Sequence, residues 1–120
     1  MQYLFLLYVD PAAAPEPGTA AFEDMVAAYR RADATMREAG VVLADSRLAS
    51  ESTATTVRVR GFETQLTDGP YAEIKEMLGG FYVVECPDLD AAVKWASTIP
   101  ASQYGGIEIR PLLDIDGDPR

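Results

Sequence analysis

Two segments with helical periodicity alternate with several strand-like segments, and this order constrains the fold more than any single motif. Residues 19–39 place apolar side chains three and four positions apart, which is the spacing of one helix face. Thr19 is a suitable N-cap for that helix and Gly40 a suitable stop. A second helix is expected within residues 87–100, with Asp88 as its N-cap. Both helices are amphipathic, so both need an apolar surface to cover.

The other ordered segments predict strands. Residues 3–9 form a continuous apolar run, which is typical of a strand covered on both faces. Residues 41–49, 79–86 and 105–113 are further short β-type runs, and "RGFE" at residues 60–63 predicts the turn of a hairpin. The order strand, helix, strand, hairpin, strand, helix, strand predicts an α+β domain of ferredoxin-like topology. In that fold both helices cover one face of an antiparallel sheet.

The length fits one domain, since the chain has 120 residues. We expect residues 1–114 to form it and residues 115–120 to be a frayed polar tail. The sheet face away from the helices still carries apolar side chains, and at this size it cannot stay exposed to water. A second copy of the same face is the simplest cover, which predicts a homodimer with two-fold symmetry and a dimeric α+β barrel.

Composition excludes several classes of function. The net charge is −9, which argues against electrostatic binding to nucleic acid and against binding to anionic lipid. Histidine is absent, so the commonest metal ligand and the usual proton shuttle at neutral pH are missing. We expect no cofactor and no zinc site, but the composition does not exclude a carboxylate site for Mg²⁺ or Ca²⁺.

The first ten residues and the single cysteine bear on location. No Lys or Arg precedes the apolar run at residues 3–9, and Asp10 ends it early, so a secretory leader is not expected. Cys86 lies in an apolar run, where a buried inert thiol is the expected state. The chain is therefore expected to be soluble and cytoplasmic, without a membrane segment.

The segment "LTDGPYAEIKEMLGG", residues 66–80, concentrates polar residues between two apolar segments. Asp68 and Pro70 favour an ordered turn around Gly69. If the following residues are helical, Glu73 and Glu76 become i,i+3 neighbours. Such a carboxylate pair beside Lys75 can share a proton or hold a cationic ligand. The alternative is a solvated loop with compensating charges.

Two arginines and two tyrosines are further candidates. Arg110 lies in the last strand, on the side expected to face the dimer partner, where it can hold an anionic ligand or form a structural salt bridge. Arg47 poses the same choice. Tyr8 and Tyr82 can line a pocket with their hydroxyls or pack in the core or interface. The pair Gly79–Gly80 lacks phosphate-loop spacing and is expected to serve the turn into the next strand.

Nearly the whole chain resembles the YCII-related family, in its DGPF subgroup, which carries a D-G-P-F/Y-A-E-x-K-E segment followed by L-G-G-[FY]. The ending "IEIRPL" at residues 107–112 is similar to the family's E-[IV]-R-P close, and residues 1–10 and 53–60 are similar to its opening and middle strands. The long motif is matched at Asp68, Gly69, Pro70, Tyr71, Ala72, Glu73, Lys75, Glu76, Leu78, Gly79, Gly80 and Phe81.

The resemblance implies a ferredoxin-like fold paired as a dimeric α+β barrel, with a pocket near the subunit interface bordered by the motif. Some distant members carry a His–Asp pair proposed as catalytic, which this chain cannot have because it has no histidine. The resemblance assigns no reaction. Subgroup members often neighbour genes for alternative sigma factors, which implies a stress or regulatory setting.

Three functional hypotheses follow. The first is a homodimer with a small-molecule pocket, possible acid–base catalysis by Asp68, Glu73 or Glu76, and electrostatic tuning by Lys75. In that hypothesis Arg110 holds an anionic group and Tyr71 packs on the ligand. The second is a non-catalytic interaction module that acts in transcriptional regulation through a protein partner. The third is that the motif only fixes the fold.

Overall fold

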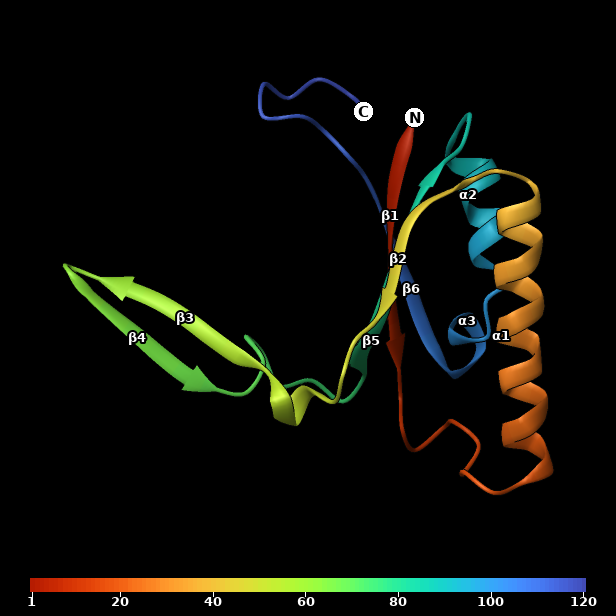
Figure 1. The fold of residues 1–120 in the computed structure, drawn as a ribbon, viewed down its shortest axis with the longest axis horizontal. Helices are drawn as coiled ribbons and strands as arrows, with labels where there is room; N and C mark the ends of the chain where they lie inside the picture. Colours follow the sequence, from red (N-terminus) through yellow and green to blue (C-terminus); the bar gives the residue numbers. More distant parts are fainter.

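A computed structural model describes residues 1–120, and its element order is the one that the sequence predicts, with one additional short helix and one 3₁₀ turn. The elements are β1 (Gln2–Val9), α1 (Ala20–Glu38), β2 (Val42–Arg47), η1 (Glu51–Thr53), β3 (Thr55–Arg60), β4 (Glu63–Asp68), β5 (Met77–Glu85), α2 (Leu89–Ala96), α3 (Ala101–Tyr104) and β6 (Gly105–Pro111). Figure 1 shows them in one view.

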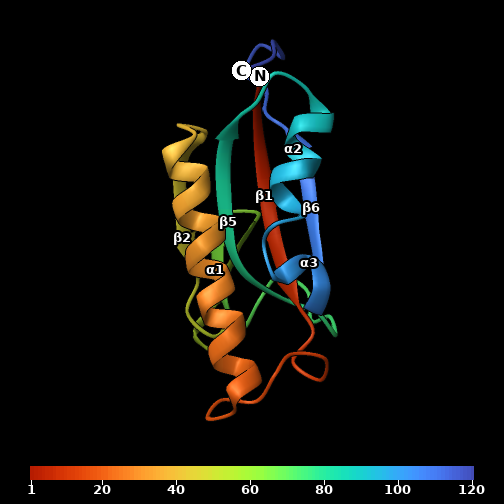
Figure 2. The ribbon, with the colours of Figure 1, turned by 90° about the vertical axis from the view of Figure 1, so that its right-hand side faces the viewer.

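Four strands form an antiparallel sheet in the order β2-β5-β1-β6. Figure 2 shows the helices lying together on one face of this sheet. The ferredoxin-like α+β architecture is therefore confirmed for the single chain. None of the helices is both long and apolar enough to cross a membrane.

Both predicted helix caps are present. The hydroxyl of Thr19 accepts a hydrogen bond from the backbone N–H of Phe22 at 3.1 Å, and the carboxylate of Asp88 accepts one from Ala91 at 2.9 Å. The second helix is shorter than predicted and ends at Ala96. A separate helix, α3, follows Pro100, because proline lacks the N–H that continues a helix but fits the start of one.

The core lies between the helices and one face of the sheet. Tyr3, Phe5 and Leu7 of β1 point into it and are buried, while the alternate side chains Leu4 and Leu6 are only half-buried. We expected β1 to be covered on both faces. Within a single chain, only the face towards the helices is covered. We call the sheet face away from the helices the open face; by register it carries Leu4, Leu6, Tyr8, Phe81, Val83, Glu108 and Arg110.

The hairpin of β3 and β4 leaves the body of the protein. Its strands pair only with each other and form a separate two-stranded sheet. Figure 1 shows this hairpin projecting from the side of the molecule opposite to the helices, and we call residues 55–68 the arm. The projection gives the chain extents of 48 × 41 × 18 Å.

Two local expectations were wrong. Gly79 and Gly80 lie inside β5 and not in a turn leading to it. The last residues are not frayed, since Leu113 pairs with Pro119 and the N–H of Arg120 donates to the carbonyl of Leu112 at 2.9 Å. Asp114 organises this return, because its carboxylate accepts hydrogen bonds from the N–H groups of residues 116 and 118 at 3.0 and 2.9 Å.

Candidate functional site

A cavity of about 490 Å³ lies at the root of the arm, where the arm meets the end of the open face. We call it the root cavity. Eight of its thirteen lining residues are hydrophobic, so it is mainly an apolar site with a few polar groups. It is lined by Tyr8, Leu48, Ala49, Ser50, Glu51, Thr53, Ala54, Pro70, Tyr71, Ala72, Ile74, Glu76 and Leu78.

Local hydrogen bonds shape the arm root. The N–H of Gly69 donates to the carbonyl of Ala54 at 2.8 Å, and the hydroxyl of Thr56 donates to the carbonyl of Gly69 at 2.9 Å. Gly69 has φ +113°, a conformation that side-chain-bearing residues rarely adopt. The glycine of the "DGP" segment is therefore required by the backbone, which bends here to carry Pro70 and Tyr71 into the cavity wall.

The opposite wall comes from residues 48–54. Ser50 starts the short η1 turn, because its hydroxyl oxygen accepts the N–H of Ser52 at 3.3 Å. This Ser/Thr-rich stretch was not among the candidates from the sequence, and its place in the cavity was missed. The only signal was the cluster of small hydroxyl residues, which is also typical of ordinary loops.

Tyr71 is 82% exposed, yet its ring is not isolated. The guanidinium of Arg58 lies 5.3 Å from the ring centroid, within the range of a cation–π contact. This contact ties the polar face of the arm to the motif. It also leaves the other parts of the tyrosine ring free to contact a ligand in the root cavity.

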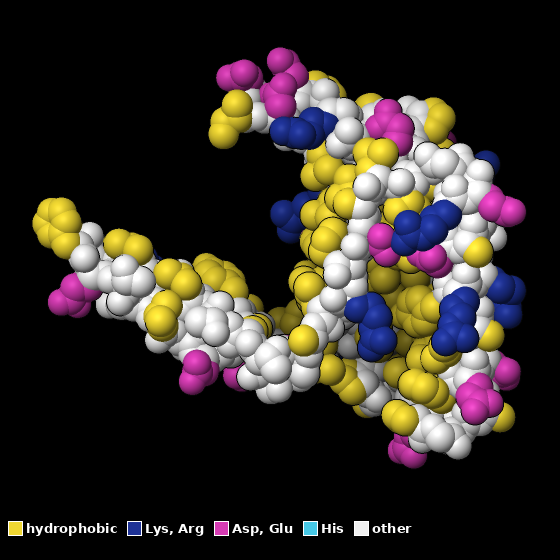
Figure 3. Space-filling model, in the orientation of Figure 1, with side chains coloured by type: hydrophobic (Ala, Val, Ile, Leu, Met, Phe, Trp, Pro, Cys, Tyr) yellow, Lys and Arg dark blue, Asp and Glu magenta, His cyan; other side chains and the backbone are white.

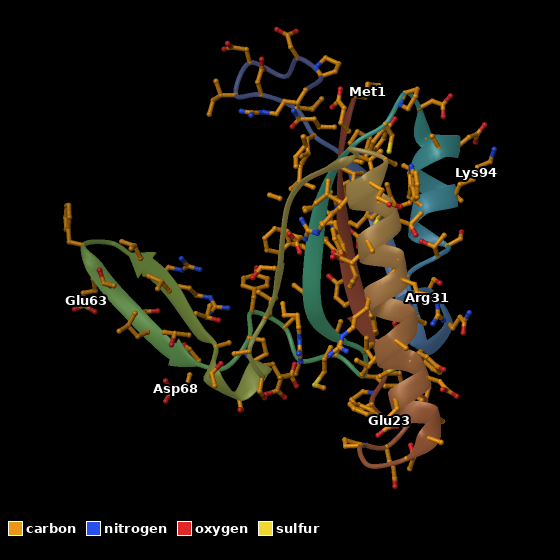
Figure 4. All side chains as sticks on the ribbon, turned by 45° about the vertical axis from the view of Figure 1, so that its right-hand side comes forward. Met1, Glu23, Arg31, Glu63, Asp68 and Lys94 are labelled. Atoms are coloured by element: carbon orange, nitrogen blue, oxygen red, sulfur yellow. The ribbon has the colours of Figure 1, made fainter.

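Of the residues singled out from the sequence, Tyr8, Tyr71 and Glu76 line the root cavity. Asp68 and Glu73 are exposed and lie outside the cavity lining. Figure 4 shows Asp68 at the root of the arm and Glu63 close to its tip. Residues 69–76 contain bends but no helix, so the carboxylate pair of Glu73 and Glu76 does not form as i,i+3 helix neighbours.

Lys75 is engaged elsewhere. Its Nζ lies 3.2 Å from Oδ2 of Asp10, which joins the motif to the end of β1. The pKa of Asp10 is lowered from its usual value, first because its carboxylate accepts the N–H of Ala12 and then because of Lys75. Lys75 itself is 79% exposed, so this pair is a surface contact.

The two arginines are not in the cavity of the same chain. Arg110 is 69% exposed on the open face and its Nε bonds the carboxylate of Glu108 in the same strand. Arg47 is exposed at the end of β2, one residue before the cavity wall begins. Within one chain, neither guanidinium is placed to hold a ligand in the root cavity.

A hydrogen-bonded network on the helix-covered face was not predicted from the sequence. Its one candidate residue, Tyr82, was expected to line a pocket or to pack in the core or interface, and it does not line the root cavity. The hydroxyl of Tyr82 donates to Oδ1 of Asp33 at 2.8 Å, and Arg37 bridges Asp33 at 2.9 Å and Asp45 at 2.8 Å. Burial and the neighbouring Asp33 carboxylate raise the pKa of Tyr82, and Arg37 lowers that of Asp33. The network joins α1 to β2 and β5.

A smaller cleft of about 250 Å³ lies between α1 and α3, lined by Ala21, Asp24, Met25, Ala28, Thr98, Pro100, Gln103 and Tyr104. None of the candidate site residues from the sequence lines it. No group of three or more Cys, Asp or Glu side chains is placed to hold a metal ion. The root cavity, in contrast, lies where the motif, the arm and the open face meet.

Comparison with known proteins supports the family and the fold. The family model of the YCII-related domain matches residues 1–116. An uncharacterised protein of Rhizobium meliloti (strain 1021) is 40% identical over 77 residues, which cover 62% of each protein. The fold is similar to that of 5-chloro-2-hydroxyhydroquinone dehydrochlorinase (TftG) from Burkholderia phenoliruptrix, solved in complex with 2,5-dihydroxybenzoquinone. The TM-score is 0.55 at 12% identity, over 98% of this chain and 99% of that one.

Proposed function

The chain belongs to the YCII-related family, and from that premise we propose that it is a homodimeric small-molecule-binding protein of the DGPF subgroup. The observation that carries the proposal is the root cavity, whose wall includes five residues of the segment 70–76 and the tyrosine at the end of β1. Its volume of about 490 Å³ falls within the range of roughly 300–1,000 Å³ typical of ligand sites.

The homodimer forms through the open face. Leu4, Leu6, Phe81 and Val83 lie on this face and are only half-buried in one chain. Figure 3 shows hydrophobic side chains on the side of the body that faces the arm. Apposition of two such faces removes this surface from water and brings the Arg110 side chains into the interface.

The lining residues favour a ring compound with hydroxyl groups. Tyr8 and Tyr71 offer aromatic surface for a flat ligand. Glu51 and Glu76 are acceptors when ionised, so they favour ligand groups that donate hydrogen bonds and disfavour an anion. The same class of compound, a dihydroxylated ring, occupies TftG, which supports the choice of first probes without fixing the ligand.

If the protein is an enzyme, Glu76 is the best-placed acid–base group. It lines the root cavity, so its carboxyl lies within reach of a ligand bound there, as general acid–base catalysis requires. Asp68, Glu73, Lys75, Arg47 and Arg110 lie outside the cavity of their own chain and take part only where a second copy brings them to it. We propose a cytoplasmic location, which suits a single buried thiol.

A second candidate function is a regulatory interaction module without catalysis. The exposed apolar side chains of the arm favour it, since large exposed apolar patches mark interaction sites. In that case the arm binds a protein partner and the root cavity is only the hinge of the arm. The two functions are separated by whether a small molecule stabilises the folded chain through the cavity.

The test is a thermal-shift screen of small hydroxylated aromatics, quinones and carboxylic acids on the wild type and on three variants. Ala72→Trp fills the cavity without removing a polar group, Glu76→Gln removes one carboxylate, and Ala13→Trp in an exposed loop is the matched control. We expect a hydroxylated ring compound to raise Tm in the wild type and in Ala13→Trp. The same compound should have no effect in Ala72→Trp and a smaller one in Glu76→Gln.

Two results would contradict the proposal. One is a set of ligands that stabilises Ala72→Trp as strongly as the wild type, which would place binding outside the root cavity. The other is no stabilising compound combined with a protein partner that is lost in arm variants, which would favour the interaction module.

A further inference from the structure

The arm exposes an apolar face that nothing in its own chain covers. Val57 and Val59 are two residues apart in β3, so they point to one face, and Leu66 is the cross-strand neighbour of Val57. These three side chains are 59%, 57% and 68% exposed, and Phe62 at the tip is fully exposed. Figure 3 shows hydrophobic side chains along the length of the arm.

The other face of the arm is polar. Arg58 lies opposite Gln65, and Arg60 lies opposite Glu63. An isolated two-stranded hairpin is at best marginally stable in water, and one with a fully exposed apolar face is less so. The arm therefore has one polar face suited to solvent and one apolar face suited to contact with another surface.

The amount of exposed surface indicates the size of the interface that covers the arm and the open face. Scaling with mass gives about 6,300 Å² for a compact protein of this size, whereas the chain exposes 8168 Å². Its radius of gyration is 16.4 Å, against about 13.6 Å for a compact domain of the same length. The excess surface is roughly 1,800 Å², about twice what each partner buries in a standard interface and in the range of obligate homodimers.

The shape of the chain favours a second copy as the occupant. Figure 1 shows the arm and the C-terminal turn of residues 113–120 projecting from the same side of the sheet. In Figure 3 they bound a hollow, with the open face along its inner wall. Under a two-fold axis each copy offers the same hollow and the same projection, so one docking arrangement covers both open faces and both arms.

We propose that the arm of each copy clasps the second copy with its apolar face, and that the second copy completes the root cavity. This inference rests on the proposed function, because it assumes the homodimer and names what closes its site. Tyr8 and Leu78 line the cavity and are cross-strand neighbours at the end of the open face. A surface that covers the open face therefore also covers this side of the cavity, which is incomplete in one chain.

The arm can be deleted without interrupting the four-stranded sheet. Ala54 and Gly69 are already joined by a hydrogen bond of 2.8 Å, and Thr55 lies opposite Asp68. Replacing residues 55–68 by the dipeptide Asn-Gly closes the chain with a two-residue turn. Sedimentation equilibrium then compares the dimer dissociation constants of the wild type and the arm-deleted chain.

Point variants keep the result interpretable if the deletion fails to fold. The double variant Val57→Thr and Val59→Thr keeps the β-branched shape but makes the apolar face polar. Because each dimer has two arms, we expect its dissociation constant to rise roughly a hundredfold. The matched control, Arg60→Thr with Gln65→Thr, changes the polar face and should leave the constant within about threefold of the wild type.

A photo-crosslink locates the arm directly. With benzoylphenylalanine at position 62, we expect crosslinks between two chains, mapped by mixing isotope-labelled and unlabelled protein. The variant Leu6→Arg, on the open face, separates this inference from the proposed dimer. If Leu6→Arg gives monomers while the arm variants and the arm-deleted chain dimerise as tightly as the wild type, the dimer stands and the arm clasp is refuted.

Three further outcomes also test the arm clasp and the proposed homodimer. Crosslinks confined to one chain refute the clasp even where the wild type is a dimer. A wild type that is monomeric at all concentrations refutes both the clasp and the proposed homodimer. Weaker dimerisation of both the Thr double variant and Leu6→Arg, with inter-chain crosslinks at position 62, supports both.

Discussion

The backbone around Gly80 gives the sharpest prediction about the fold. A Cβ added at Gly80 would lie 2.8 Å from the carbonyl oxygen of Ser46 in the neighbouring strand β2, whereas one added at Gly79 would meet only the carbonyl oxygen of Leu7 at 3.9 Å. The first distance is shorter than atoms can approach, and the obstacle is backbone, so β2 has to move. Gly80→Ala and Gly79→Ala are thus adjacent substitutions of equal chemistry with opposite expected effects.

The magnitudes follow from two opposing terms. Overpacking of this kind costs about 1–3 kcal/mol, and replacing a glycine by alanine lowers the entropy of the unfolded chain, which returns about 0.4–1 kcal/mol. We expect Gly80→Ala to lower the free energy of unfolding by about 1–2 kcal/mol, or Tm by about 4–8 °C. Gly79→Ala should be neutral or up to about 1 kcal/mol more stable.

Urea unfolding at one fixed protein concentration measures both values, because the stability of the proposed homodimer would depend on concentration. Hydrogen exchange adds a local readout, since the N–H of Leu48 donates to the carbonyl of Gly79 at 2.9 Å and should exchange faster in Gly80→Ala. The movement also shifts the cavity wall that begins at Leu48. Equal stability of the two variants, or a larger loss in Gly79→Ala, would refute the reasoning.

Three other predictions test the core and the network. Tyr82→Phe should lower the free energy of unfolding by about 1 kcal/mol. Because the pKa of Tyr82 is raised above its usual 10.0, its contribution is present below about pH 10 and is lost as the pH rises further, so the alkaline loss in urea unfolding should be larger in the wild type than in Tyr82→Phe. Cys86 is 1% exposed and burial raises its pKa, so it should react with a thiol reagent only after denaturation; rapid reaction of the native protein would contradict this. Phe5→Ala removes a fully buried ring and should cost about 3–5 kcal/mol by the same urea assay, and a loss under 1 kcal/mol would mean that the core is elsewhere.

The sequence predicts this fold well because its local signals agree with one another. Hydrophobic periodicity, two cap residues and a hairpin turn all point to the same topology. Details that depend on tertiary packing were not predictable. Leu89 and Val93 fit the apolar stripe of the second helix, yet they are 52% and 46% exposed, while Ala92 and Ala96 make the close contact with the core.

The candidate site was only partly predictable, for a physical reason. The motif predicts the turn at Gly69, which the structure contains. Two of its candidate residues, Tyr71 and Glu76, line the cavity. It gives no information on the wall formed by residues 48–54, because contact between these segments arises only when the arm root closes. Likewise, no local pattern shows that Lys75 pairs with Asp10 and not with the neighbouring glutamates.

The most direct test of the proposed ligand site is an NMR titration of the wild-type protein with hydroquinone, a dihydroxylated ring that is neutral at neutral pH, followed through the backbone amide signals. The account predicts that the shifted signals cluster at Tyr8, residues 48–54 and residues 70–78, which surround the root cavity. Shifts centred on the cleft between α1 and α3, or no shifts for this or any other hydroxylated ring compound, would contradict the assignment of the root cavity as the ligand site.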